Sequence, residues 1–372
     1  MQFVNNDLMS PAAASTSPRR RGVLAALSAA AVLAVGACSG ATGAFGGGFS
    51  VQDLLAELPM IDDGGLIAAG DLEAASAAAG LERPADAGAD GAHDWIMGLT
   101  ASTETGVFVP APGDFLRSFG EEGGDELGWD LSDVHAFAHH EALPQQNLLV
   151  TGDFDGDTLS ADLEDLGEGV YSAGTGEDFY LDHTSRSPVR PTGAPLRLAR
   201  DGDRIMVSPQ EQVVREWVAG EQGSTLADHE HVSDLAAALD DLGVYSAVLV
   251  THEPQLQPVN QQQRERWEQS AIREPFSAIG VGWAIDDDDP VVRVAYHFDT
   301  AEAAERGADQ VQRVWQEGAT ADGLPVTDRF ALQQVDTDGA VVIADMHVAG
   351  DGAAPHAYHM LGARDVPFGY LP

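Results

Sequence analysis

The chain has 372 residues, a hydrophobic fraction of 44%, one Cys, and 60 acidic residues against 19 basic residues, all of which are Arg. The formal net charge of −41, with no cluster of Arg beyond residue 21, excludes binding to nucleic acid or to an anionic membrane surface through grouped cations. A single Cys excludes an intramolecular disulfide, a zinc site made of several Cys and an iron–sulfur cluster.

The first forty residues have the pattern of an export signal. Arg19, Arg20 and Arg21 form a positive segment, and residues 22–37 follow without any charge. This run is shorter than the about 20 apolar residues of a spanning helix, and it has the length of the hydrophobic part of a signal peptide. The Arg pair before a short apolar segment also fits the twin-arginine export route, so that route and the general secretory route both stay open.

The uncharged run ends in Val35, Gly36, Ala37 and Cys38, which are an aliphatic residue, two small residues and the one Cys of the chain. This sequence resembles the lipobox of bacterial lipoprotein precursors. The resemblance implies cleavage before Cys38, lipidation of its thiol and a mature N-terminus held in a membrane, since several acyl chains give stable anchoring. The composition, without Lys and rich in Ala, Gly and acids, is similar to that of actinobacterial or salt-adapted proteins.

Four segments follow from this resemblance and from the composition. We expect residues 1–37 to be a signal peptide and residues 38–49, rich in Gly, Ala and Ser, to be a flexible tether. We expect an N-terminal module over residues 50–250 and a C-terminal module over residues 251–372. The body would lie in water on the extracytoplasmic side of the cell membrane, attached to it by lipid.

From residue 50 the hydrophobic pattern predicts a mixture of helices and strands. The first predicted elements are a short helix near Gln52, a strand over 65–70 and helices over 72–79, 93–99 and 114–119, with loops over 81–93 and 120–128. A hairpin over 133–139 and 147–154 follows, then a helical run bearing Leu159, Leu163 and Leu166, strands over 196–200 and 204–207, and a capping box over 208–211.

The later part of the chain repeats this order. It has a hairpin over 276–285 and 291–298, a helix bearing Ala304, Ala308, Val311 and Trp315, and a second hairpin over 330–335 and 340–348. A helix that begins at 225–228 and a strand over 244–250 link the two parts. We therefore predict an α+β fold of two related modules, each an antiparallel sheet with helices on one face, joined by this helical and strand linking unit. Chance similarity between two hairpin patterns is the alternative.

Asp153, Asp155, Asp157 and Glu164 form the best metal candidate in the sequence. Their spacing matches acidic positions of an EF-hand loop, where carboxylate oxygens would surround Ca²⁺. Thr158 stands where that loop needs Gly, and a predicted strand precedes the acids. The alternative interpretation is a strand end followed by an acidic residue that caps a helix.

Histidines form three local groups, which are His135 with His139 and His140, His229 with His231, and His356 with His359. Imidazole is a common metal ligand, but no group has the His-Glu-x-x-His spacing of metalloproteases. Pro355 and the neighbouring glycines favour a loop for residues 356–359. No Gly-x-Ser-x-Gly motif or phosphate-binding loop occurs, whereas a Ser-His-Asp triad stays open because its members need not be close in sequence.

The absence of a chemical motif favours a non-catalytic, lipid-anchored module for binding, interaction or envelope support. We expect no cofactor and no nucleic-acid partner, and we expect contact with a membrane through the N-terminal lipid together with a protein or small-molecule partner that the sequence does not name. A solute-binding lipoprotein of a transporter is the first alternative, although such proteins have parallel lobes rather than hairpins. A metal-dependent hydrolase is the second, and it would need His and acids that converge in one pocket.

Overall fold

The computed structural model describes residues 49–61, 65–85, 88, 91–101, 105–110, 121–160, 162–252, 254–258, 261–286, 289–320, 323–349 and 354–372. The expected signal peptide, with Arg19, Arg20 and Arg21, the lipobox residues Val35, Gly36, Ala37 and Cys38, and all of the expected tether except Phe49 lie outside the described residues. So does the helix expected over 114–119. Contacts group residues 41–372 as one unit, to which every element below belongs.

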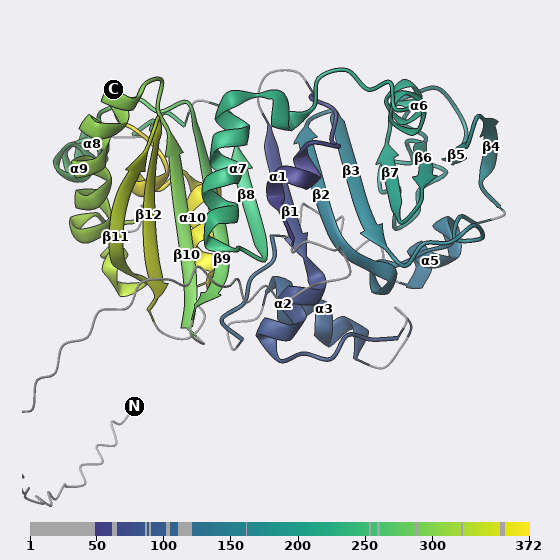
Figure 1. The fold of residues 1–372 in the computed structure, drawn as a ribbon, viewed down its shortest axis with the longest axis horizontal. Helices are drawn as coiled ribbons and strands as arrows, with labels where there is room; N and C mark the ends of the chain where they lie inside the picture. Colours follow the sequence, from purple (N-terminus) through teal and green to yellow (C-terminus); the bar gives the residue numbers. More distant parts are fainter. Residues whose placement is uncertain are drawn as a thin grey trace, which may run out of the picture. The chain divides into compact units, whose positions relative to one another are not determined.

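Among the described residues, twelve strands hydrogen-bond side by side into one antiparallel sheet (Figure 1). In their order across the sheet they are β11 (Phe330–Asp338), β12 (Val341–Val348), β10 (Asp289–His297), β9 (Ala278–Asp286), β8 (Ser246–Val250), β1 (Leu66–Asp71), β2 (Val134–Ala142), β3 (Gln145–Gly152), β7 (Arg204–Ser208), β6 (Leu196–Asp201), β5 (Val170–Ala173) and β4 (Glu164–Gly167). The predicted α+β class with antiparallel hairpins is confirmed.

The two central strands, β1 and β8, join the sheet's two halves. Leu66 lies opposite Val250, and Gly70 lies opposite Ser246. On one side of this pair the order is β1-β2-β3-β7-β6, which β5 and β4 extend, and on the other side it is β8-β9-β10-β12-β11. The described strands thus form a continuous sheet rather than two separate ones.

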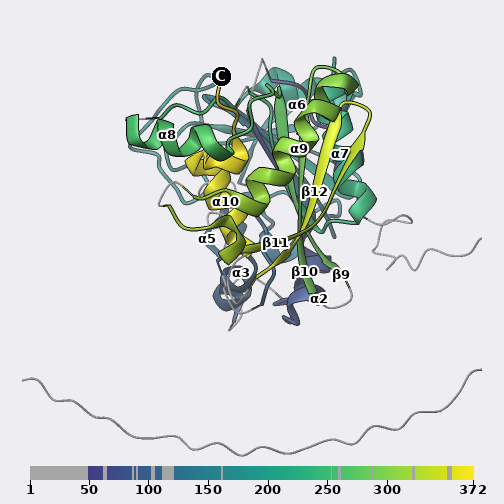
Figure 2. The ribbon, with the colours of Figure 1, turned by 90° about the vertical axis from the view of Figure 1, so that its left-hand side faces the viewer.

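Helices pack on both faces of the sheet, as Figure 2 shows for α7 and α10. The helices are α1 (Val51–Leu55), α2 (Leu72–Ala79), α3 (Ala92–Thr100), α5 (Glu121–Leu127), α6 (Glu211–Ala219), α7 (Glu230–Leu242), α8 (Gln261–Ser270), α9 (Ala301–Glu317) and α10 (Ala354–Ala363), with short 3₁₀ turns η1 (Leu131–Asp133), η2 (Leu226–Asp228), η3 (Val326–Asp328) and η4 (Val366–Phe368). Buried side chains of α2, α3, α9 and α10 belong to one core, and those of α1, α6 and α7 belong to the other.

The expectation of helices on one face is therefore wrong, and β1 shows the reason. Ile67 and Ala69 are buried in one core while Ala68 between them is buried in the other. A strand covered on both faces is apolar at every position, whereas a strand with one wet face alternates. Both cores lie between Val51 and Leu371, so residues 49–372 contain the complete described core.

Most of the predicted elements are confirmed, including the two hairpins of each half and the long helix α9. The helix predicted through Leu159, Leu163 and Leu166 is wrong, because these residues form turns and part of β4. Leu159 and Leu163 pack in one core and Leu166 in the other, so their helical spacing does not mark a single face.

Three local predictions are also wrong. The loop expected over 120–128 contains α5, and the loop expected around 356–359 is helix α10, whose first turn holds Pro355, where no intrahelical N–H is needed. The capping box expected over 208–211 does not form. Asp178, from another part of the chain, accepts from the backbone N–H of Glu211 at 3.0 Å and so caps α6 instead. Within the described residues, no helix has the length and apolar character needed to cross a membrane.

Candidate functional site

The four acids of the predicted metal site do not converge. Asp155 accepts from the backbone N–H of Asp157, and Asp153 lies 3.2 Å from Nε2 of His135 on β2. Glu164 is an exposed residue of β4. Among the described residues, no group of three or more His, Cys, Asp or Glu is arranged to hold a metal ion.

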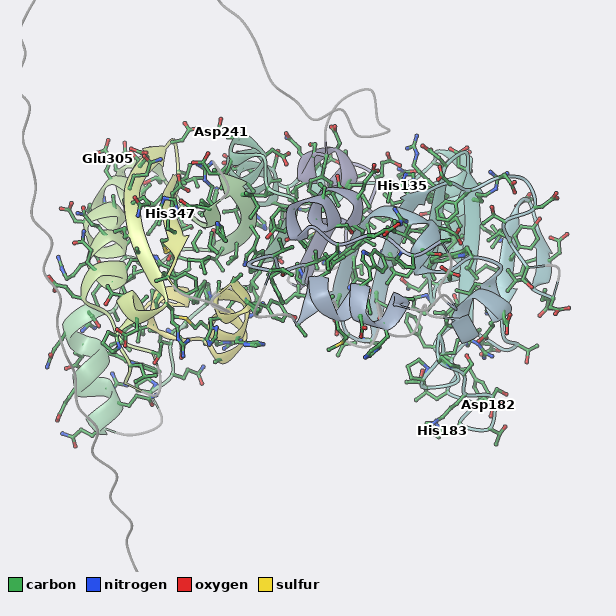
Figure 3. The ribbon with its side chains drawn as sticks, turned by 90° about the horizontal axis from the view of Figure 1, so that it is seen from below. His135, Asp182, His183, Asp241, Glu305 and His347 are labelled. Atoms are coloured by element: carbon green, nitrogen blue, oxygen red, sulfur yellow. The ribbon has the colours of Figure 1, made fainter. Side chains whose placement is uncertain are left out.

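Figure 3 shows His135, His183 and His347 at separate places on the body. Two of the predicted histidine groups do keep their rings close, since His229 and His231 lie 6.2 Å apart between ring centroids, as do His356 and His359. His139 and His140 are neighbours on β2, so their side chains lie on opposite faces of the sheet. Both are buried, and burial lowers the pKa of each to about 4. They are therefore neutral side chains of the two cores.

One Ser-His-Asp arrangement does exist. Ser277 Oγ lies 3.0 Å from His297 Nδ1, and His297 Nε2 lies 3.4 Å from an oxygen of Asp234. In a catalytic triad the serine bonds Nε2 and the acid accepts from Nδ1, so here the two nitrogens have exchanged roles. Ser277 Oγ also lies 3.1 Å from the backbone carbonyl of His297, to which it donates. The arrangement orients His297 rather than activating Ser277.

A pocket of about 390 Å³ lies where β1 begins and β8 ends. Its walls are mainly apolar and are formed by Leu66, Val250, Pro254, Leu361 and Phe368. Because Leu66 and Val250 are opposite partners in the central strand pair, the pocket lies where the two halves of the sheet meet. The helix α10 and the turn η4 supply the wall that faces these strands.

The polar residues of the pocket are His252, Tyr358, His359 and Arg364. The Arg364 guanidinium lies 3.2 Å from Nε2 of His252. A guanidinium can only donate, so Nε2 accepts this hydrogen bond and carries no proton. The His252 imidazole is therefore neutral. Burial and the neighbouring charge of Arg364 lower the pKa of His252. Burial, and secondly the charge of Glu141, raise the pKa of Tyr358. The pocket thus combines an apolar interior with the Arg364 cation, the neutral His252 ring and the Tyr358 hydroxyl.

Arg364 differs from the six described arginines that form ion pairs. Arg190, Arg197, Arg204, Arg215, Arg293 and Arg306 each pair with a carboxylate. No carboxylate of the described residues lies within 4.0 Å of the Arg364 side chain. Arg364 is thus a cation beside an apolar pocket, and its contact is His252 rather than a described carboxylate.

The backbone of Arg364 is also unusual, with φ +52° in the left-handed region. It follows the end of α10, where its N–H donates to the Leu361 carbonyl and the next N–H, of Asp365, donates to the Met360 carbonyl. This is the Schellman ending of a helix, whose left-handed position is normally Gly because a Cβ costs about 1–2 kcal/mol there. Arg364 therefore occupies a place that backbone energetics would give to Gly.

None of the motifs in the sequence indicated this pocket, apart from His359, which belongs to a noted histidine pair. The residues that form it come from β1, the segment after β8 and the C-terminal segment, which are far apart in the chain. One signal was present. Arg364 and Asp365 are the only charged residues between 354 and 372, a segment otherwise rich in apolar side chains.

Comparison of the chain with family models, with curated proteins and with solved structures finds no match.

Proposed function

We propose that the protein is a non-catalytic binding lipoprotein of the cell membrane, held by lipid on the extracytoplasmic side, and that its pocket binds a small molecule. The observation that carries this proposal is the pocket beside β1 and β8. Its volume of about 390 Å³ falls in the range of about 300–1,000 Å³ for small-molecule sites, and its mainly apolar wall with a few polar groups is typical of them.

The lipobox resemblance supports the location of the protein. A lipidated Cys38 would leave residues 38–49 between the membrane and α1, and twelve residues span at most about 40 Å when extended. The body would remain near the membrane surface and would search for its ligand there. The high negative charge keeps such a body soluble and away from anionic lipid.

We also propose that the two halves of the sheet are related modules. The equal order of strands in β1-β2-β3-β7-β6 and β8-β9-β10-β12-β11 supports this idea. The module boundary would then fall before β8 rather than at residue 250. The pocket takes Leu66 from one half and Val250 from the other, so joining the halves would create a site that neither has alone.

The alternatives draw less support. A solute-binding lipoprotein of a transporter could use the same pocket, but the described sheet is antiparallel rather than built of parallel lobes. A metal-dependent hydrolase would need converging ligands, and the described residues do not supply them.

The anchor can be tested with Cys38→Ser in the full chain. We expect the Ser variant to incorporate no radiolabelled palmitate in cells and to accumulate as the uncleaved precursor, because the chain has no other thiol. The wild-type chain, labelled in parallel, is the positive control. Label of equal intensity in the Ser variant would contradict lipidation at Cys38.

A further inference from the structure

We propose that the ligand of this pocket is a small amphiphilic carboxylate, whose apolar part enters the pocket while its carboxylate is bound by Arg364 at the rim. This inference rests on the proposed binding function and names the chemical class of the ligand. The direct observation is the position of Arg364, an exposed guanidinium that lines an apolar pocket and contacts His252 rather than a described carboxylate.

The charge of the site selects an anion over a neutral or cationic ligand. A guanidinium is a cation, and its planar fork of donors matches the two oxygens of a carboxylate. His252 accepts from Arg364 through Nε2, which leaves its Nδ1–H as a further donor. The site offers one permanent cation, so a single negative charge is matched, whereas a second charge on the ligand would remain uncompensated near Glu141.

The apolar wall selects a hydrocarbon body for the same ligand. Leu66, Val250, Leu361 and Phe368 contribute it, and all four belong to or pack against the core that contains α10. An engineered cavity of about 150 Å³ holds a benzene ring, so about 390 Å³ accepts a considerably larger apolar group. Burial of its methylenes would give the tail most of the affinity, and Arg364 would give the selectivity.

The backbone of Arg364 is the second, independent observation. A residue with φ +52° at a helix end is strained unless it is Gly, and strain of this kind concentrates at functional sites. Placing Arg there fixes where the guanidinium leaves the backbone, at the end of α10 and at the rim of the pocket. Gly at this position would relieve the strain but would leave the site without a cation.

The test uses residues 49–372 and three probes with the same ten-carbon chain, which are decanoate, decan-1-ol and decylammonium. Titration calorimetry at pH 7.5 should show decanoate binding at least about tenfold more tightly than either other probe, because only a carboxylate forms charge-assisted hydrogen bonds with Arg364. Arg364→Gln should reduce decanoate affinity to that of decan-1-ol. Arg313→Gln, the same change at an exposed position of α9, should leave all three affinities unchanged.

The variant Arg364→Gly distinguishes an effect on ligand binding from an effect on the stability of the fold. We expect this variant to melt at the same temperature as the wild type or higher, because Gly suits the left-handed position, and to lose the preference for decanoate. If Arg364→Gly still binds decanoate more tightly than the other two probes, Arg364 does not bind the carboxylate. If all three probes bind the wild type equally, the ligand class is wrong while the binding function survives. If none of the three binds, the proposed binding function fails as well.

Discussion

The free energy of unfolding of residues 49–372 should fall steeply between pH 7.5 and pH 5. His139 is 3% exposed and His140 is 0% exposed, and burial is the main cause that lowers the pKa of each from 6.5 to about 4. In this pH range the unfolded chain binds protons at both positions and the folded chain does not. The stability that these two histidines contribute is therefore fully present above pH 6.5 and is lost as the pH falls below that value. Below about pH 4 their contribution no longer changes.

The effect is large for a single domain. A difference of about 2.5 pKa units corresponds to about 3 kcal/mol for each histidine below pH 4, of which about 2 kcal/mol is already lost at pH 5. Total stabilities are about 5–15 kcal/mol, so the pair controls a substantial fraction of the whole. Burial also lowers the pKa of His231 and His252, which add to the slope with the same sign.

Urea unfolding at pH 7.5, 6 and 5 measures this dependence. The double variant His139→Leu, His140→Leu should lose most of the slope between pH 7.5 and pH 5, because it removes both buried titratable groups. His183→Gln is the matched control, since Figure 3 shows His183 at the end of a projecting loop. An unchanged slope in the double variant would show that other groups cause the acid sensitivity.

Removing Arg293 should destabilise the body more than any other single ion-pair change. Arg293 on β10 and Asp345 on β12 lie opposite each other, with Nε to Oδ1 at 2.7 Å and Nη2 to Oδ2 at 2.8 Å. The pair is 6% and 7% exposed, and Arg293 also donates to the Ala238 carbonyl of α7 at 2.7 Å. Gln334 on β11 donates to the same carboxylate at 2.9 Å.

Arg293→Met leaves the charge of Asp345 buried with the amide of Gln334 as its remaining described donor. Breaking a buried pair in this way costs about 3–5 kcal/mol, whereas replacing both partners by apolar residues is far less costly. We therefore expect Arg293→Met to lose about 3–5 kcal/mol in urea unfolding, and Arg293→Met with Asp345→Leu to recover most of that loss. If the single and the double variant are equally stable, the loss of stability does not come from the unpaired, buried charge of Asp345.

The sequence predicts the strands well because hairpins carry local signals, which are alternation and turn residues. It predicts a strand over 291–298, which β10 confirms, and Val292, Val294 and Tyr296 of this strand are buried on one face. Arg293 lies on the opposite face of β10. That face is in fact covered by α7, so Arg293 is buried and paired, and no local pattern shows which helix will cover which face.

The candidate site was less accessible to sequence reasoning for the same reason. Leu66, Val250 and Leu361 come from segments that are far apart in the chain. No sequence motif marks the place where these segments meet. The spaced acids from Asp153 to Glu164 do form a motif, yet their backbone follows turns and β4 rather than a metal-binding loop. Sequence spacing reports on one segment, whereas a site is formed by the packing of several.

One measurement tests the central claim of a lipid-anchored binding protein. A protease recognition sequence placed within residues 38–49 should let protease that is added outside the cell membrane release the body, and non-denaturing mass spectrometry then weighs it. We predict a released wild-type body that carries the extra mass of a small carboxylate, and a released Arg364→Gly body without that mass. A body that remains with the membrane after cleavage, or a wild-type body released with no added mass, would contradict the account.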